Sequence, residues 1–261
     1  MLRPDDRVLV GMSGGKDSTA LLYLLWWLQH TQGISLHLTP VHVNGLVDPA
    51  PNLEPLESWV RSLGLNFSSV KAKDGGRSGP RDLSPCFRCS WRRKHTLFST
   101  ARKVGCNVVA LGHHSDDVAV TGIMNLFYQG RFGSILPTQS YFKGEFKLIR
   151  PLYFVSEKSI VTLIRKERLP VIPSQCIHQH ETSRTFSMRW LDTIMEDRPD
   201  AKRSLLGALH RQAAEICGTT SPDISASSRK RSGHSSSVRT RCGPVIPTFP
   251  VSCRMGEDGM R

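Results

Sequence analysis

Residues 7–18 read RVLVGMSGGKDS, and this stretch predicts a buried strand, a glycine turn and the start of a helix. Its first half is the short β-branched and apolar run expected of a strand in a parallel sheet. Residues 19–29 then continue as an apolar helical pattern. Gly14 and Gly15 allow a tight turn whose N–H groups face an anion, at which the positive end of the new helix also points. The stretch therefore predicts a phosphate site.

The other side chains of the turn refine this prediction. Ser13 and Ser18 offer hydroxyl donors, and Lys16 offers a positive charge. Asp17 is unusual beside phosphate, so we expect Mg²⁺ or a substrate amine to offset it. The turn lacks the four-residue gap and the Gly-Lys-Ser/Thr ending of a Walker loop, which disfavours γ-phosphate hydrolysis. The alternative is an ordinary strand-to-helix turn that happens to contain two glycines.

Apolar strand patterns and helical patterns alternate along the rest of the chain. Further strands are expected at 34–44, 65–71 and 105–112, and residues 148–152 are again apolar. Helices are expected at 53–63, 85–102, 118–128, 156–166, 182–197 and 201–216. Residues 129–147 are expected to form a basic connection, and 169–173 an extended segment. This alternation predicts an α/β fold, a Rossmann-like open parallel sheet with helices on both faces. Residues 1–218 would form one domain, and the serine-rich, basic residues 219–261 a disordered tail.

A second polar cluster follows the strand predicted at 105–112. His113, His114, Ser115, Asp116 and Asp117 would lie at the carboxyl end of that strand, on the same sheet edge as the glycine turn. The two carboxylates are suited to hold Mg²⁺ on ATP oxygens. The alternative is a polar helix start capped by Ser115 or Asp116.

The loop 44–55 follows the second predicted strand at the same edge of the sheet. It is expected to cover an adenine or a ribose, with Asn44 as a nucleotide contact.

Cysteines form the third signal. Cys86 and Cys89 would lie on one face of the first turn of a helix, where thiol pKa values are lowered and both sulfurs can reach one metal centre. C-x-x-C alone is equally typical of half a zinc site, a redox pair or two core cysteines. Cys106, inside a predicted strand, is expected in the core. Seven cysteines without a secretory leader or a bilayer-spanning run indicate a soluble, cytoplasmic protein with metal or redox chemistry.

The net charge of +13 suggests a polyanionic partner such as a nucleic acid, although a generally basic proteome or solubility would also explain it.

Four stretches match one family in order. SGGKDS (13–18) resembles the PP-loop of the N-type ATP pyrophosphatases. Together with PCFRCSWRR (85–93), ALGHHSDD (110–117) and IRPLYFVSEKSI (149–160) followed by LPVIPSQC (169–176), it resembles the TtcA family of tRNA-cytidine 2-sulfurtransferases over about residues 5–215. The resemblance implies an enzyme that uses ATP, with Mg²⁺, to adenylate an anticodon-loop cytidine at tRNA position 32. Sulfur would then displace AMP from that cytidine.

The resemblance also implies a set of site residues. A 4Fe–4S cluster would be held by Cys86, Cys89 and Cys176, with sulfur from a cysteine desulfurase. The chain departs from the family's Ile-Pro-Cys-x-x-Cys pattern, since Ser174 and Gln175 precede Cys176. We expect ATP contacts from Ser13, Gly14, Gly15, Lys16, Asp17, Ser18, Asn44 and His113, and catalytic roles for Lys16, Asp17, Asp116 and Asp117. The expected tRNA phosphate contacts are Arg88, Arg92, Arg93, Arg131 and Arg184. A homodimer that does not bind a membrane is expected.

Two other functions fit part of this pattern. A lysidine synthetase shares the glycine turn and acts on the same carbon of cytidine, but it needs no cluster. A non-catalytic relic that binds RNA or senses redox state would explain the departures from the family pattern, which include a short N-terminus and a divergent tail.

Overall fold

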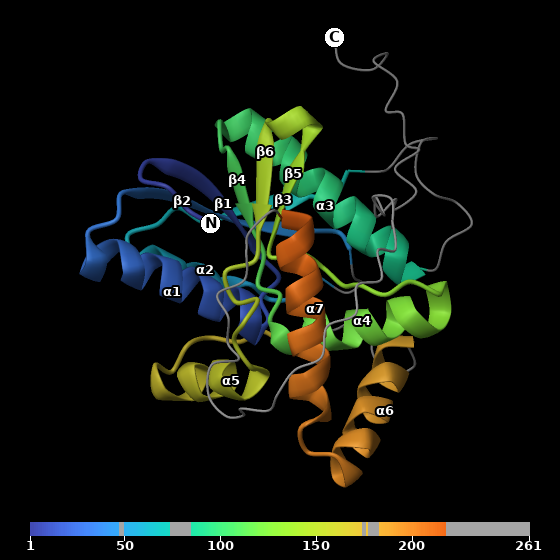
Figure 1. Cartoon of the computed structure of the whole chain (residues 1–261). Coiled ribbons are helices and arrows are strands. Elements are labelled where there is room, and N and C mark those ends of the chain that lie inside the picture. The colour runs from blue at the N-terminus through green and yellow to red at the C-terminus, as the bar shows by residue number, and fades with distance from the viewer. Residues whose placement is uncertain (47–49, 74–84, 174–175, 177–182, 218–261) are drawn as a thin grey trace.

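A computed structural model describes residues 1–46, 50–73, 85–173, 176 and 183–217 (Figure 1). One six-stranded sheet, in the order β3-β2-β1-β4-β6-β5, forms its centre. Its strands are β1 (Asp6–Met12), β2 (Leu36–Asn44), β3 (Ser68–Lys71), β4 (Val108–Ala110), β5 (Thr138–Tyr141) and β6 (Phe146–Ile149). All neighbouring strands are parallel except β5, which runs antiparallel to β6.

Helices cover both faces of this sheet. They are α1 (Lys16–Gln32), α2 (Glu54–Ser62), α3 (Pro85–Val104), α4 (Ser115–Gln129), α5 (Glu157–Lys166), α6 (Ser183–Asp197) and α7 (Ala201–Cys217). Successive residues of β1 point to opposite faces, as the pleat of a strand requires. Val8 and Val10 pack with apolar residues of α1, α2 and α5, whereas Leu9 packs with Leu97 and Phe98 of α3. The predicted α/β fold with helices on both faces is thus confirmed.

The last two helices form a layer with α4. Val118 of α4 packs against Leu209 of α7, and Ile123 packs against Leu191 of α6 (Figure 1). The sequence patterns at 182–197 and 201–216 predicted these helices to within one residue at each end.

The strand order places two loops side by side. β1 pairs with β2 on one side and with β4 on the other, with Val10 opposite Ala110. Ligands of open α/β sheets bind at such a reversal of strand order, outside the carboxyl ends of the strands. The turn after β1 and the loop after β4 therefore face each other.

The predicted connection at 129–147 was wrong in part. It contains β5 and a short 3-10 helix at Phe142–Gly144, and β6 begins at Phe146. β5 is a polar edge strand, so it has no apolar alternation by which to recognise it. β3 and β4 are shorter than predicted, and residues 169–173 have no regular structure. Cys106 is buried, as predicted. The predicted tail lies outside the described residues.

Within the described part of the chain, no helix combines the length and the apolar character needed to cross a bilayer.

Candidate active site

The glycine turn leaves the start of α1 open to an anion. Gly14 adopts φ +86°, a left-handed conformation that glycine tolerates best. The Ser18 hydroxyl donates to Gly15 O at 2.9 Å and accepts from Ser13 N at 3.2 Å, which closes the turn from inside. Gly15, the residue before α1, makes no side-chain capping bond. First-turn N–H groups without a capping side chain are the donors that bind phosphate at a helix start.

A distant segment covers this turn. Ile172 N donates to Gly14 O at 2.8 Å, and a Cβ on Gly14 would lie 3.1 Å from the Ile172 Cβ. Beside it lies a pocket of about 380 Å³, lined by Asn52, Pro55 and residues 170–173. The loop predicted to cover an adenine or ribose therefore supplies two of the lining residues. Asn44 ends β2 at the same sheet edge, where its Oδ1 accepts from Gly45 N at 2.7 Å.

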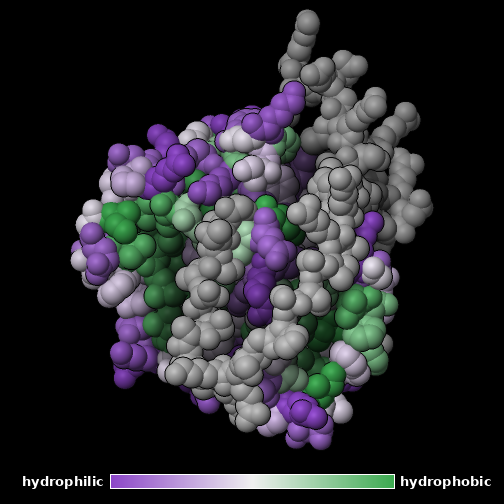
Figure 2. Space-filling model, viewed as in Figure 1, coloured by the Kyte–Doolittle hydropathy of each residue, from purple (hydrophilic) through white to green (hydrophobic). Residues whose placement is uncertain are grey.

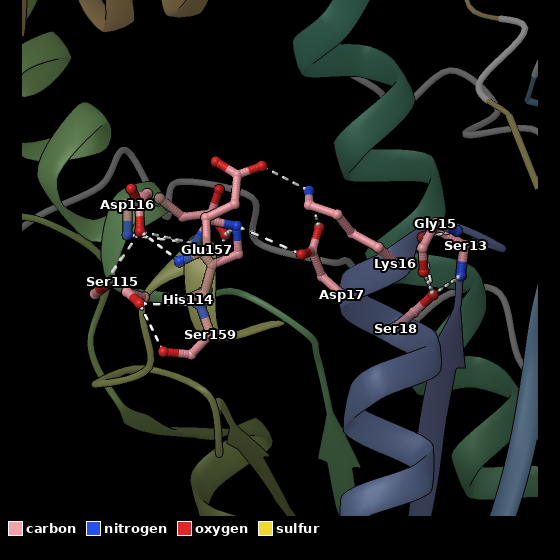
Figure 3. Close-up of polar contacts among 12 residues, drawn as sticks. Ser13, Gly15, Lys16, Asp17, Ser18, His114, Ser115, Asp116, Glu157 and Ser159 are labelled. Atoms are coloured by element: carbon pink, nitrogen blue, oxygen red, sulfur yellow. Dashed lines mark hydrogen bonds and ion pairs between the residues drawn. The ribbon is translucent and has the colours of Figure 1, made fainter. Parts of the chain in front are cut away.

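The loop after β4 centres on His114. This residue caps α4, because its Nδ1 accepts from Asp116 N at 3.3 Å and its backbone N donates to Asp117 Oδ2 at 2.9 Å. His114 Nε2 also lies 3.6 Å from Asp17 Oδ1 and 3.7 Å from Asp117 Oδ2. Three carboxylates from both loops, those of Asp17, Asp116 and Asp117, therefore surround one imidazole, and Figure 3 shows the first two beside the ring. Burial alone would lower the pKa of His114, but the carboxylates of Asp116, Asp117 and Asp17 raise it.

Each of these carboxylates also pairs with a cation. Lys16 Nζ lies 3.2 Å from Asp17 Oδ2, Arg184 of α6 pairs with Asp117, and Lys202 of α7 pairs with Asp116. Burial opposes the ionisation of Asp116, but the nearby His114 ring and the hydrogen bonds from Lys202 and the Glu157 backbone hold its pKa well below the usual range. Burial opposes the ionisation of Asp117 too, but the charges of Arg184 and His114 lower its pKa, so both acids of the loop are charged at neutral pH.

Glu157, the first residue of α5, joins the two loops. Its backbone N donates to Asp116 Oδ2 at 2.9 Å, and its Oε1 lies 2.8 Å from Lys16 Nζ (Figure 3). Ser156 caps the helix by accepting from Ser159 N, so the position of Glu157 is fixed by a local motif. Burial lowers the pKa of Lys16, but Glu157 and Asp17 outweigh it and raise that pKa.

Gly112 permits the close approach of β4 to α1. A Cβ at this position would lie 2.8 Å from both C and O of Asp17, which are backbone atoms. Only glycine fits there without a shift of one loop.

The pKa of His113 is shifted in the opposite direction from that of His114. Burial, followed by the positive charge of Arg150, lowers its pKa to about 4, so the ring is neutral at pH 7. Among the described residues its Nδ1 is buried without a hydrogen-bond partner, and so is Asp17 Oδ1. Asp17 Oδ1 belongs to the candidate site, where it lies 3.6 Å from His114 Nε2.

The predicted cysteine ligands lie on two segments. Cys86 is exposed and Cys89 half-buried on the first turn of α3, and Cys176 is half-buried. Among the described residues, Cys86, Cys89 and Cys176 do not form a group arranged to hold a metal ion.

Sequence reasoning named both loops but missed some of the residues that join them. Glu157, Lys202 and Ile172 were not assigned to the site, and His114 was assigned only as part of its motif. One local signal existed, since Asp117 three residues after His114 is the spacing of a capping box. Arg184, predicted to contact phosphate, pairs with Asp117 here.

A family model described as a PP-loop domain matches residues 2–186. The tRNA-cytidine(32) 2-sulfurtransferase of Neisseria meningitidis is 36% identical over 177 residues, which cover 66% of this chain and 55% of that protein. The chain thus spans about half the length of that relative. The enzyme of the same name from Geobacter sulfurreducens is 32% identical over 214 residues, 80% of this chain and 83% of that one.

Among solved structures, the tRNA uridine-34 thiolase of Methanococcus maripaludis with its 4Fe–4S cluster matches with a TM-score of 0.65 and 23% identity. The match covers 82% of this chain and 74% of that one. At this identity it supports the fold described above.

Proposed function

Because this chain belongs to the PP-loop domain family, we propose that it is an ATP-dependent transferase that thiolates a cytidine of tRNA. The names of its relatives point to tRNA position 32. The observation that carries the proposal is the meeting of two loops, the open helix start at Gly15 and the carboxylates around His114, at the reversal of strand order.

The glycine turn would hold the phosphates of ATP. Backbone N–H groups at the start of α1 and the Lys16 ammonium supply the positive field that a leaving pyrophosphate needs. Ser13 and Ser18 bond within the turn and so keep its shape. We assign Asn44 and His113 to the nucleotide as well, since they lie at the carboxyl ends of β2 and β4, the two strands that flank β1.

The chemical problem is the C2 oxygen of cytidine, which is a poor leaving group. In the proposed reaction this oxygen attacks the α-phosphorus of ATP, and the bond from that phosphorus to pyrophosphate breaks. The oxygen then leaves as part of AMP when sulfur bonds to C2. The proposed catalytic residues are Lys16, Asp17, Asp116 and Asp117. They lie around the position proposed for the phosphates of ATP, whose negative charge is redistributed when pyrophosphate leaves.

Mg²⁺ fits the carboxylates by chemistry, since it prefers oxygen ligands. Asp17 Oδ1 is the best candidate ligand, because it is buried without a hydrogen-bond partner among the described residues. Asp116 and Asp117 are already paired with Lys202 and Arg184, which would have to move or share. When bound, the ion would screen the charge of the α-phosphate.

The three cysteines fit an iron–sulfur cluster by ligand type, and three protein thiolates leave one iron open. Cys86 and Cys89 suit two neighbouring ligands, because they are three residues apart on one helix. The described position of Cys176 does not complete a three-ligand group. When bound, such a cluster would supply the sulfur. A cysteine desulfurase would be the donor of that sulfur. We also expect the chain to act on tRNA in the cytoplasm as a homodimer.

The decisive experiment measures 2-thiocytidine by mass spectrometry in tRNA from cells with and without the gene. In parallel, tRNA-dependent pyrophosphate release is measured for the purified chain, for Lys16→Gln and for Lys158→Gln, an exposed lysine on α5 that serves as the control. We expect only Lys16→Gln to lose the activity. Unchanged 2-thiocytidine in the deletion strain would refute the proposal.

A second experiment tests the cluster. The chain is purified without oxygen, and its iron content and absorption near 400 nm are compared for Cys86→Ser, Cys176→Ser and the core variant Cys106→Ala. Loss of iron in the first two variants alone supports the ligand set. Absence of iron from the unaltered chain would favour the lysidine-type reaction, which needs no cluster.

A further inference from the structure

An aromatic ridge stands on the surface where α4 meets α6. We define it as Phe127 of α4 with Phe186 and Trp190 of α6. Phe127 and Trp190 meet edge to face, with ring centroids 4.8 Å apart. Phe186 precedes Trp190 by four residues, so the two lie on one face of α6. On the face of the molecule that Figure 2 shows, apolar side chains gather at the right, over the end of α4 and the start of α6.

The ridge is exposed although its helices have a separate buried side. Phe186 is 63% exposed, Phe127 60% and Trp190 39%, whereas Leu191 of α6 is 6% exposed and packs on α4. The inner side therefore already holds the two helices together. Exposed aromatic surface beyond that need is typical of an interaction site.

The ridge begins next to the candidate active site. Arg184 on the first turn of α6 pairs with Asp117, two residues before Phe186. A chain that lies along α6 would therefore pass from the carboxylates around His114 onto the rings. This placement suits a chain-like substrate that puts one of its residues into the active site while the residues on either side of it stay outside.

Charge indicates the nature of that substrate. Arg189 is exposed on α6 and lies on the same helix face as Phe186, three residues away. The chain as a whole carries a net charge of +13. Aromatic rings with arginine beside them are the combination that binds single-stranded nucleic acid, because bases stack on rings while cations meet phosphates.

We propose that the aromatic ridge stacks the nucleotides of a single-stranded RNA loop that flank the base placed in the active site. This inference rests on the proposed function and adds to it the surface that holds the loop. A second copy of the chain is the alternative occupant of the ridge, and the test below distinguishes it from RNA.

The test measures binding of the full chain to an anticodon stem–loop RNA by fluorescence anisotropy at several salt concentrations. The variants are Phe186→Ala and Arg189→Gln. The control is Trp27→Ala, since Trp27 is 43% exposed on α1, far from α6 in Figure 1. Thermal melting of each variant confirms folding.

We expect Phe186→Ala to bind about tenfold more weakly, as loss of one stacked base predicts, with an unchanged salt dependence. Arg189→Gln should reduce the slope of log affinity against log salt concentration by about one, the contribution of a single phosphate contact. Trp27→Ala should bind like the unaltered chain. Binding by Phe186→Ala within about twofold of that chain would overturn the proposal.

Two further outcomes separate this inference from the proposed function. If the unaltered chain binds the RNA through the ridge but cells without the gene keep their 2-thiocytidine, the reaction is refuted and the ridge stands. If Phe186→Ala instead converts a dimer into monomers in analytical ultracentrifugation, and RNA affinity falls only with that change, the ridge is a contact between copies and the inference is overturned.

Discussion

Replacement of Gly112 by alanine tests whether the close approach of the two loops is needed for activity. The added Cβ would lie 2.8 Å from C and O of Asp17 and 3.0 Å from Ser18 N. All three are backbone atoms in the first turn of α1, so they cannot rotate away. An ordinary carbon contact needs about 3.5 Å, so the end of β4 or the start of α1 must move by roughly 0.7 Å.

This shift has two expected effects. Overpacking of this kind costs about 1–3 kcal/mol of folding free energy, which corresponds to a melting temperature lower by roughly 2–12 °C for a chain of this size. The shift also separates Asp17 and Lys16 from His114 and Glu157. A misplacement approaching 1 Å costs about a hundredfold in rate. We expect tRNA-dependent pyrophosphate release to fall by about that factor in a protein that is still folded.

Gly122→Ala is the matched control. Its Cβ would lie 2.6 Å from Leu209 Cδ1, an even shorter distance, but that atom is the end of a flexible side chain. Gly122 lies in α4, where alanine gains about 1 kcal/mol of helix propensity. Its activity should stay within about twofold of the unaltered chain. If Gly112→Ala keeps a third or more of the activity, or if Gly122→Ala loses as much, the close approach is not what the reaction requires.

Three more substitutions test the same site. Glu157→Gln removes the charge beside Lys16 but keeps the backbone bond to Asp116, so steady-state kinetics should show pyrophosphate release about tenfold slower, while Lys158→Gln shows no change. His113 has a pKa of about 4 in the folded chain, so the unfolded chain takes up a proton on this ring first as the pH falls below about 6.5. Urea unfolding should therefore show that the free energy of unfolding falls by roughly 2 kcal/mol between pH 7 and 5, and His113→Asn should reduce this loss. An identical pH dependence in the variant contradicts the assignment. Lys202→Met leaves the Asp116 carboxylate without its cation. In the same assay it should lower the free energy of unfolding by about 1–2 kcal/mol, given that both side chains are partly exposed. Lys202→Arg should retain most of this stability, and an equal loss in both variants would refute an electrostatic role.

The elements of the fold were predictable where the pattern is local. β1, α1 and the capped start of α5 each carry their signal within a dozen residues, and the order of strand and helix patterns implies an open α/β sheet. β5 was not predictable in this way. Thr138–Tyr141 has no apolar alternation, and its strand character comes from the hydrogen bonds it exchanges with β6.

The candidate site was predictable only loop by loop. Parallel strands end at one edge of a sheet, which is why the turn at 13–18 and the loop at 113–117 were expected to meet. The ion pairs that complete the site join residues 67 and 86 positions apart, from Asp117 to Arg184 and from Asp116 to Lys202. Such pairs depend on how α6 and α7 pack on α4, and no periodicity in the sequence reports that packing.

The long reach of these pairs has a consequence for the order of folding. Glu157 and Asp116 are 41 positions apart, and Lys202 and Asp116 are 86 apart. During synthesis the glycine turn leaves the ribosome long before Lys202 does, so the acids around His114 have no cation from α7 until that helix has emerged. Because contacts between distant residues form late, the nascent chain should acquire the ion pair between Asp116 and Lys202 only after α7 has left the ribosome.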